Sequence, residues 1–125
     1  MKALTLIRPW AWAIVASTKR IENRTWKADY IVGKRIAIHA GAKVDERACV
    51  QIENFHGSVL PASARDMGIV GTAIVTGFVT RSHDRWFCGP IGWTLEDVIR
   101  LPEPIPCKGA QGLWNIPPDV LRKIP

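Results

Sequence analysis

Residues 69–79 read Ile69-Val70-Gly71-Thr72-Ala73-Ile74-Val75-Thr76-Gly77-Phe78-Val79. This is the longest β-branched run in the chain, and it predicts a central, largely buried strand over residues 68–80. Glycines inside a strand are typical of bends and bulges, which allow a sheet to curl. The run therefore predicts a sheet that curls towards a small barrel around its central strand.

Shorter elements are predicted on both sides of this strand. Alternating apolar residues and turn signals predict strands over residues 2–7, 20–26, 34–40 (closed by Gly41) and 113–116. Helical spacing and proline positions predict helices over residues 9–17, over residues 44–55 and from Pro117 or Pro118 onward. The remaining segments are a loop and candidate flexible flap over 57–67, a mixed segment over 93–101 and an extended stretch over 102–106. The expected fold class is α+β, a curled mixed sheet with a few short flanking helices.

Length and composition predict one domain over residues 1–125. A chain of 125 residues that is 47% hydrophobic can bury a core without disulfides or metals. The three cysteines are widely spaced and form no CxxC pair, so we expect neither a disulfide framework nor a metal site, and no cofactor. The first apolar run is short and interrupted by Arg8, so we expect a cytoplasmic protein with no signal peptide and no membrane partner.

Positive charge is concentrated in the first part of the chain. Ten of the 17 Lys and Arg residues lie at or before Arg47, against four of the 11 Asp and Glu residues, and the rest of the chain carries equal numbers of both. Tryptophans lie in the same part. Basic residues interleaved with aromatic residues favour an anionic partner such as RNA or a nucleotide. The alternative is a solvated basic face with no ligand.

Lys19, Glu22 and Arg24 lie within six positions, directly after the predicted tryptophan-rich helix. On a strand Glu22 and Arg24 share one face with Trp26, and Lys19 can reach either side from the preceding turn. Lys19 and Arg24 would hold a phosphate or a base carbonyl while Glu22 accepts a hydrogen bond from an exocyclic amine. In that case the cluster is exposed, and its substitution should leave stability nearly unchanged. Alternatively, Glu22 and Arg24 form a structural ion pair and Lys19 is solvated.

The tryptophans are candidates for stacking on a planar ligand. Trp10 and Trp12 are two positions apart on a helix and point to nearly opposite faces, so one belongs to the core and the other can border a cleft. Trp26 and Trp93 can either pack in the core or stack on a base.

His39 and Lys43 are further ligand candidates. They lie at and just beyond the end of the predicted strand over 34–40, where an imidazole and a cation can reach the rim of a cleft. A hydrogen-bonded structural histidine fits the same position.

Several motifs carry a family resemblance. They are Arg8-Pro9-Trp10-Ala11, Lys19-x-x-Glu22-x-Arg24, Ile36-Ala37-Ile38-His39-Ala40, Gly71-x-Ala73 and Glu103-Pro104-Ile105-Pro106-x-x-Gly109. Together they resemble the ASCH family, the activating signal cointegrator homology domains of the PUA-like superfamily, over nearly the whole chain. The family signature is Gly-x-Lys-x-x-Glu-x-Arg. Ser17 stands here where that glycine is usual, and Arg8 stands where many members have glutamine before Pro-Trp.

The resemblance implies a small PUA-like β-barrel. It also implies a cleft for RNA or a modified nucleotide, lined by the signature and by Arg8 and Pro9 ahead of it.

The resemblance leaves open whether the chain is a binding protein or an enzyme. Some small relatives in the superfamily hydrolyse the acetyl group of N4-acetylcytidine with a threonine, a lysine and a glutamate, and others have been described as ribonucleases. Lys19 would correspond to that lysine, but Glu22 stands in the place of the threonine, and the strand over 68–80 contains no acid. Thr18 and Thr25 are nearby substitutes. Acyl transfer needs a nucleophile, a base and a charge-stabilising donor in mutual reach, and only the base and the donor are evident.

Three functions therefore remain. The first is binding of RNA or a modified nucleotide. The second is metal-independent hydrolysis of a modified nucleoside or of RNA, with Lys19, Glu22 and Arg24 as catalytic residues. The third is a protein-interaction module.

Overall fold

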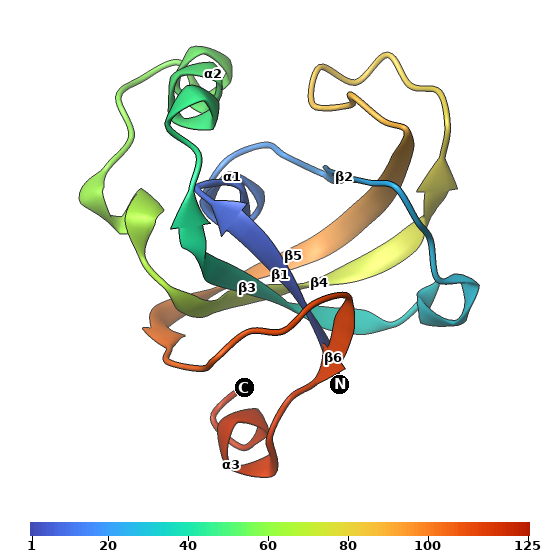
Figure 1. Ribbon diagram of the computed structural model, residues 1–125, viewed down its shortest axis with the longest axis vertical. Helices are drawn as coiled ribbons and strands as arrows, with labels where there is room; N and C mark the ends of the chain where they lie inside the picture. The colour runs from blue at the N-terminus through green and yellow to red at the C-terminus, as the bar shows by residue number, and fades with distance from the viewer.

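A single six-stranded mixed sheet forms the framework of the computed structural model, which describes residues 1–125. The strands are β1 Lys2–Arg8, β2 Ile21–Arg24, β3 Arg35–Val44, β4 Gly68–Val79, β5 Ile91–Ile105 and β6 Leu113–Asn115. The helices are α1 Trp10–Ala16, α2 Glu46–His56 and α3 Pro118–Leu121, with 3-10 turns η1 Asp29–Ile31 and η2 Ala62–Arg65. The strand order is β2-β5-β4-β3-β1-β6, and β1 and β3 are the parallel pair (Figure 1). The predicted α+β class with a curled mixed sheet is confirmed.

The predicted central strand is β4, which pairs with β3 on one side and with β5 on the other. Its pairing with β5 shifts register at three places, two of which end at Gly71 and Gly77, where glycines predict such irregularities. At Gly71 a Cβ would overlap the carbonyl oxygen of Ile99 on β5 and lie 2.6 Å from a methyl group of Val15 on α1. Glycine therefore allows β4 to approach β5 and the overlying helix closely.

The sheet curls but does not close into a barrel, because β2 and β6 remain its two edges. β6 is short, and its pairing with β1 ends where Leu113 faces Leu4. The next carbonyl of β1, that of Thr5, accepts a hydrogen bond of 2.8 Å from the Arg24 side chain of β2. The Arg24 side chain thus connects β2 to β1 at a place where the strands of a closed barrel would be joined by backbone hydrogen bonds.

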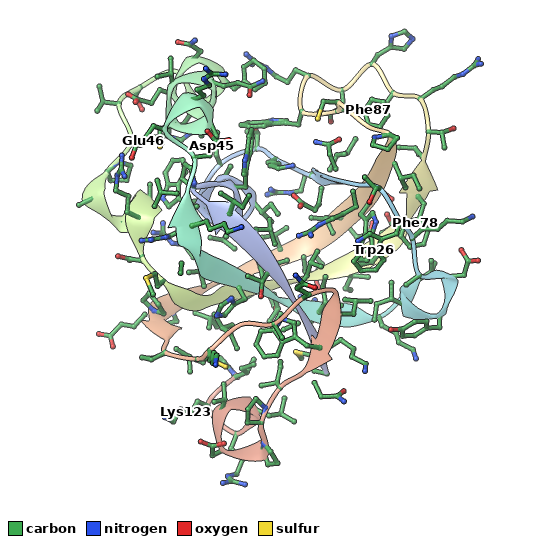
Figure 2. All side chains as sticks on the ribbon, in the orientation of Figure 1. Trp26, Asp45, Glu46, Phe78, Phe87 and Lys123 are labelled. Atoms are coloured by element: carbon green, nitrogen blue, oxygen red, sulfur yellow. The ribbon has the colours of Figure 1, made fainter.

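Helix α1 lies over the concave face of the sheet and contacts β1, β3, β4 and β5 (Figure 1). Ala11 and Ile14 of α1 join the larger core cluster with Trp93 of β5. Trp26 and Phe78 contact the Trp93 ring edge-on, at centroid distances of 4.9 Å and 5.2 Å, and lie side by side at this end of the sheet (Figure 2). A second cluster on the other face packs α3 against residues of β1, β3 and β5.

Three element boundaries differ from the sequence prediction. β2 ends at Arg24, so Trp26 is not on the strand. β3 continues through Gly41 to Val44, because β1 goes on pairing alongside it as far as Arg8. The mixed segment and the extended stretch are one strand of 15 residues, β5, in which register shifts and prolines interrupt the expected alternation.

The other predicted elements are found close to their expected limits. Asp45 caps α2, where its side chain accepts hydrogen bonds from the backbone amides of Arg47 and Ala48. The segment after α2 contains η2, where Arg65 forms two hydrogen bonds with Glu46, of 2.9 Å and 2.8 Å. No helix has the length and hydropathy that crossing a bilayer requires.

Candidate functional site

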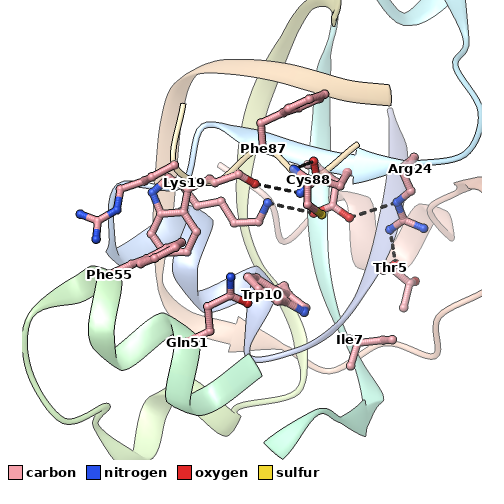
Figure 3. A pocket seen from close by; sticks show the side chains of 13 residues that line it. Thr5, Ile7, Trp10, Lys19, Arg24, Gln51, Phe55, Phe87 and Cys88 are labelled. Carbon is pink, nitrogen blue, oxygen red and sulfur yellow. Dashed lines mark hydrogen bonds and ion pairs between the residues drawn. The ribbon is translucent and has the colours of Figure 1, made fainter. Parts of the chain in front are cut away.

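A cavity of about 390 Å³ opens beside β2 (Figure 3). Its walls come from β1, α1, β2, α2 and the loop between β4 and β5. The lining residues are Thr5, Ile7, Trp10, Lys19, Glu22, Asn23, Arg24, Gln51, Phe55, Arg85, Trp86, Phe87 and Cys88. We call this space and its 13 lining residues the base cavity. It contains the whole Lys19, Glu22 and Arg24 cluster.

The carboxylate of Glu22 lies between two cations. Its Oε1 is 3.4 Å from Lys19 Nζ, and its Oε2 is 3.1 Å from Arg24 Nε. Lys19 Nζ also donates to the carbonyl of Ile21, and it lies 5.5 Å from the centroid of the Trp10 ring. Nη2 of Arg24 donates to the carbonyl of Thr5. Each oxygen of one carboxylate thus faces a different cation.

Lys19 and Glu22 are buried, with 1% and 8% of their surface exposed. The expectations that the cluster is exposed and, in the alternative, that Lys19 is solvated are therefore wrong. Residues of α2 and the β4–β5 loop surround it, and nothing local in the sequence indicates that cover. Substitution in this cluster will consequently affect stability.

Burial lowers the pKa of Lys19, because it disfavours the ammonium form. The Coulomb attraction and hydrogen bond of Glu22 oppose this shift, and Cys88 and Asp84 oppose it more weakly. A lysine whose pKa is lowered in this way is suited to accept or donate a proton nearer neutral pH than an exposed lysine.

Arg20, the residue after Lys19, turns back onto the end of α1. One nitrogen of the Arg20 side chain donates to the carbonyls of Ile14, Ser17 and Lys19, at 2.9 Å, 3.2 Å and 3.0 Å. These are carbonyls at and beyond the end of α1, which a helix leaves without intrahelical partners. The first basic residue after the helix thus enters the cavity, and the second holds the end of the helix.

Aromatic rings form much of the wall of the base cavity. Phe55 of α2 contacts Trp86 edge-on at 4.9 Å between centroids, and the Arg85 guanidinium lies 4.3 Å from the centroid of the Phe55 ring. Trp10 and Phe87 also belong to this wall, on two sides of the cluster (Figure 3). The sequence prediction included Trp10 but missed the other four residues. The basic and aromatic run over 85–87 is the signal that could have found three of them.

Asn23 holds the loop that closes this wall. Its side-chain amide donates to the carbonyl of Trp86 at 2.9 Å, and its oxygen accepts from the backbone amides of Cys88 and Gly89 at 2.9 Å and 3.0 Å. A β2 residue between two members of the cluster therefore positions the loop over that cluster.

A second cavity of about 730 Å³ adjoins the first and shares Thr5, Ile7 and Arg24 with it. We call it the basic groove. Besides Arg24, three predicted residues line it, namely Trp26, His39 and Lys43. The structure thus brings these residues to the neighbouring cavity, on the other side of Arg24.

His39 is a buried, hydrogen-bonded residue on the floor of the basic groove, with 3% of its surface exposed. Its Nε2 donates to the carbonyl of Cys107 at 2.7 Å, which leaves Nδ1 to accept from the Thr5 hydroxyl at 3.1 Å. The Thr5 oxygen in turn accepts from Trp114 Nε1 at 3.0 Å. Both ring nitrogens have protein partners, which agrees with the structural alternative.

The remaining predicted residues lie outside both cavities. Trp93 is completely buried, and its indole N–H donates to the carbonyl of Trp26 at 2.9 Å. Trp12 is 6% exposed and packs edge-on against His56, so Trp10 is the member of that pair that borders the cleft.

Arg8 and Pro9 do not line either cavity. Arg8 donates to the carbonyls of Arg65 at 2.6 Å and Ala42 at 2.7 Å, so it joins η2 to the end of β3. Pro9 is fully buried at the start of α1. The motif that they begin supports the fold around the cavity.

Neither threonine considered as a nucleophile lines the base cavity. Thr18 accepts a hydrogen bond of 3.1 Å from Trp86 Nε1, and Thr25 lies beyond the end of β2. The hydroxyl and thiol side chains in the lining are those of Thr5 and Cys88. No cluster of three or more His, Cys, Asp or Glu side chains is arranged to hold a metal.

Comparison with protein-family models matches residues 4–87 to the ASCH domain. The matched range contains all of the base cavity except Cys88. No curated protein matches the chain.

Proposed function

This chain belongs to the ASCH domain family, a PUA-like family often linked to RNA binding, and from that premise we propose that it binds RNA or a modified nucleotide in the base cavity. One observation carries the proposal. The Glu22 carboxylate lies between the cations of Lys19 and Arg24 and lines a cavity of about 390 Å³ with aromatic walls. That volume lies within the range of about 300–1,000 Å³ that is usual for small-ligand sites.

The chemistry of the cluster matches the edge of a nucleobase. A carboxylate has about four lone-pair positions, so Glu22 can accept from an exocyclic amine while it keeps its ion pairs. Lys19 and Arg24 are donors for a ring carbonyl or a phosphate. The Trp10 ring offers a face for stacking, which every base can use.

Hydrolysis of a modified nucleoside is the second candidate. The observation that favours it is the buried Lys19, whose pKa is lowered by desolvation, in contact with Glu22. Such a pair is typical of acid–base sites, although structural ion pairs also arise in this way. The Thr5 hydroxyl bonds to His39 and the Cys88 thiol to the carbonyl of Gly89, so neither is hydrogen-bonded to Lys19 or Glu22. Binding is therefore the proposal that needs fewer additional groups.

Titration of intrinsic tryptophan fluorescence with single-stranded RNA, with the four ribonucleosides and with N4-acetylcytidine tests both candidates. Trp10→Leu should weaken binding about tenfold or more, because base–aromatic stacking is worth about 1–3 kcal/mol. Tyr30→Leu is the control, since Tyr30 is 57% exposed and lines neither cavity. Affinity for RNA should fall steeply with salt.

Absence of binding at low salt, or equal affinity of the Trp10 variant and wild type, would contradict the proposal. Release of acetate from N4-acetylcytidine that disappears in Lys19→Met would establish the hydrolase instead.

A further inference from the structure

The basic groove differs from the base cavity in charge. Its lining includes Arg24, Lys43 and Lys108, and it contains no Asp or Glu. Lys43 and Lys108 are exposed and form no ion pair. The base cavity, by contrast, contains the Glu22 carboxylate. With no carboxylate to oppose its cations, the groove is the more favourable of the two cavities for an anion.

The loop that carries Lys108 is held in place by contacts with His39 and Thr5. The carbonyl of Cys107 accepts from His39, so the loop after β5 is anchored directly before Lys108. A Cβ on Gly109 would lie 2.7 Å from both the Thr5 hydroxyl and the His39 ring. The absence of a side chain at Gly109 thus lets the loop lie against the floor of the groove and brings Lys108 to its edge.

Arg24 connects the two cavities. It pairs with Glu22 in the base cavity, and its side chain lines both cavities. Thr5 and Ile7 of β1 also belong to both, so the two cavities form one continuous surface along β1. A ligand with a base in the first cavity can therefore extend into the second without leaving the protein surface.

We propose that the basic groove binds the phosphodiester backbone next to the base held in the base cavity. The preferred ligand is then a single-stranded oligonucleotide rather than a free nucleoside or mononucleotide. Single-stranded RNA fits because its bases can be splayed out of a stack, as entry into a closed cavity requires. Trp26, which also lines the groove, offers a stacking face for a second base. This inference rests on the function proposed above.

The test compares two double variants that each remove two lysine or arginine charges. Lys43→Ala with Lys108→Ala removes the two exposed cations of the groove. Arg122→Ala with Lys123→Ala is the control at the chain's far end, because neither residue lines either cavity. Figure 2 shows Lys123 beside the C-terminal helix. Fluorescence anisotropy is measured with a labelled mixed-sequence single-stranded RNA of about six nucleotides, within the site sizes of about 4–16 nucleotides known for single-strand binders. A ribonucleoside and a 5′-mononucleotide are measured by competition.

We expect the groove variant to bind the oligonucleotide at least tenfold more weakly and to bind the nucleoside as wild type does. The slope of log affinity against log salt should fall by about 1.4, because each phosphate contact contributes about 0.7 for single strands. The control pair should bind like wild type. Trp10→Leu should weaken binding of every ligand.

Three results would overturn the inference. One is wild-type affinity in the groove variant while Trp10→Leu loses binding, which would leave the proposed function intact. Another is an equal loss in the groove and control variants, which would indicate net charge alone. The third is a mononucleotide that binds wild type as tightly as the oligonucleotide. If wild type binds none of these ligands, the proposed function itself fails.

Discussion

Replacing Glu22 by glutamine would leave Lys19 as a buried cation without its carboxylate partner. Lys19 is 1% exposed, so water cannot take the place of that partner. The side chain of the variant is nearly the same size, so the effect comes from charge and not from packing. The free energy of unfolding should therefore fall.

The size of the loss in unfolding free energy depends on the contacts that Lys19 retains in the variant. Removing one partner of a buried ion pair costs about 3–5 kcal/mol. Lys19 Nζ retains the carbonyl of Ile21 and the Trp10 ring at 5.5 Å, and glutamine still offers an acceptor oxygen. We therefore expect the lower end of the range, about 3 kcal/mol, which is a fall in Tm of about 12 °C at about 4 °C per kcal/mol for a domain of this size.

Urea unfolding of wild type, Glu22→Gln, Lys19→Met and the double variant measures the coupling between the two residues. Methionine keeps most of the volume of the lysine stem but carries no charge. In the double variant the buried ammonium of Lys19 is gone, and Arg24 has lost the same carboxylate in both variants, so the double variant should be more stable than Glu22→Gln alone by about 2 kcal/mol.

The pH dependence gives an independent check. Burial already holds the pKa of Lys19 below its ordinary 10.5, and Glu22 opposes that shift. Without Glu22 the pKa should fall further, so folded Glu22→Gln loses the lysine proton at a lower pH than folded wild type. The stability gap is thus largest at neutral pH and narrows as pH rises between the two folded-state pKa values, below 10.5. A gap below about 0.5 kcal/mol at pH 7, or purely additive effects in the cycle, would refute the reasoning.

Two further predictions concern the walls of the cavities. Cys88 is exposed, whereas burial raises the pKa of the Cys49 thiol, so iodoacetamide should modify Cys88 before Cys49, and bound RNA should slow the reaction of Cys88. Mass spectrometry identifies the modified cysteine. Equal rates at Cys88 and Cys49, with and without RNA, would contradict the assignment of Cys88 to the base cavity. Gly109→Ala should cost about 1–3 kcal/mol in thermal unfolding, because its Cβ would lie 2.7 Å from the His39 ring, whereas Gly77→Ala, with 3.7 Å to Thr94, is the milder control.

The sequence by itself determined the elements whose signal is local. The run over 69–79 identified β4, because a strand buried on both faces needs apolar residues at every position. Pro9 marked the start of α1, and residues 44–55 marked α2. The spacing of Lys19, Glu22 and Arg24 also sufficed to bring their charges together, since residues so close in the chain need only a turn and a strand to meet.

Burial and distant neighbours were decided only by the tertiary structure. Lys19 is buried because α2 and the β4–β5 loop come from later parts of the chain to cover it, and no periodicity near residue 19 records that contact. Lys43 and Lys108 also lie far apart in the chain, and they line one groove because the loop after β5 is anchored on His39. A sequence pattern reports the face that a residue takes on its own element. What that face meets depends on contacts between elements far apart in the chain, which form only when the sheet assembles.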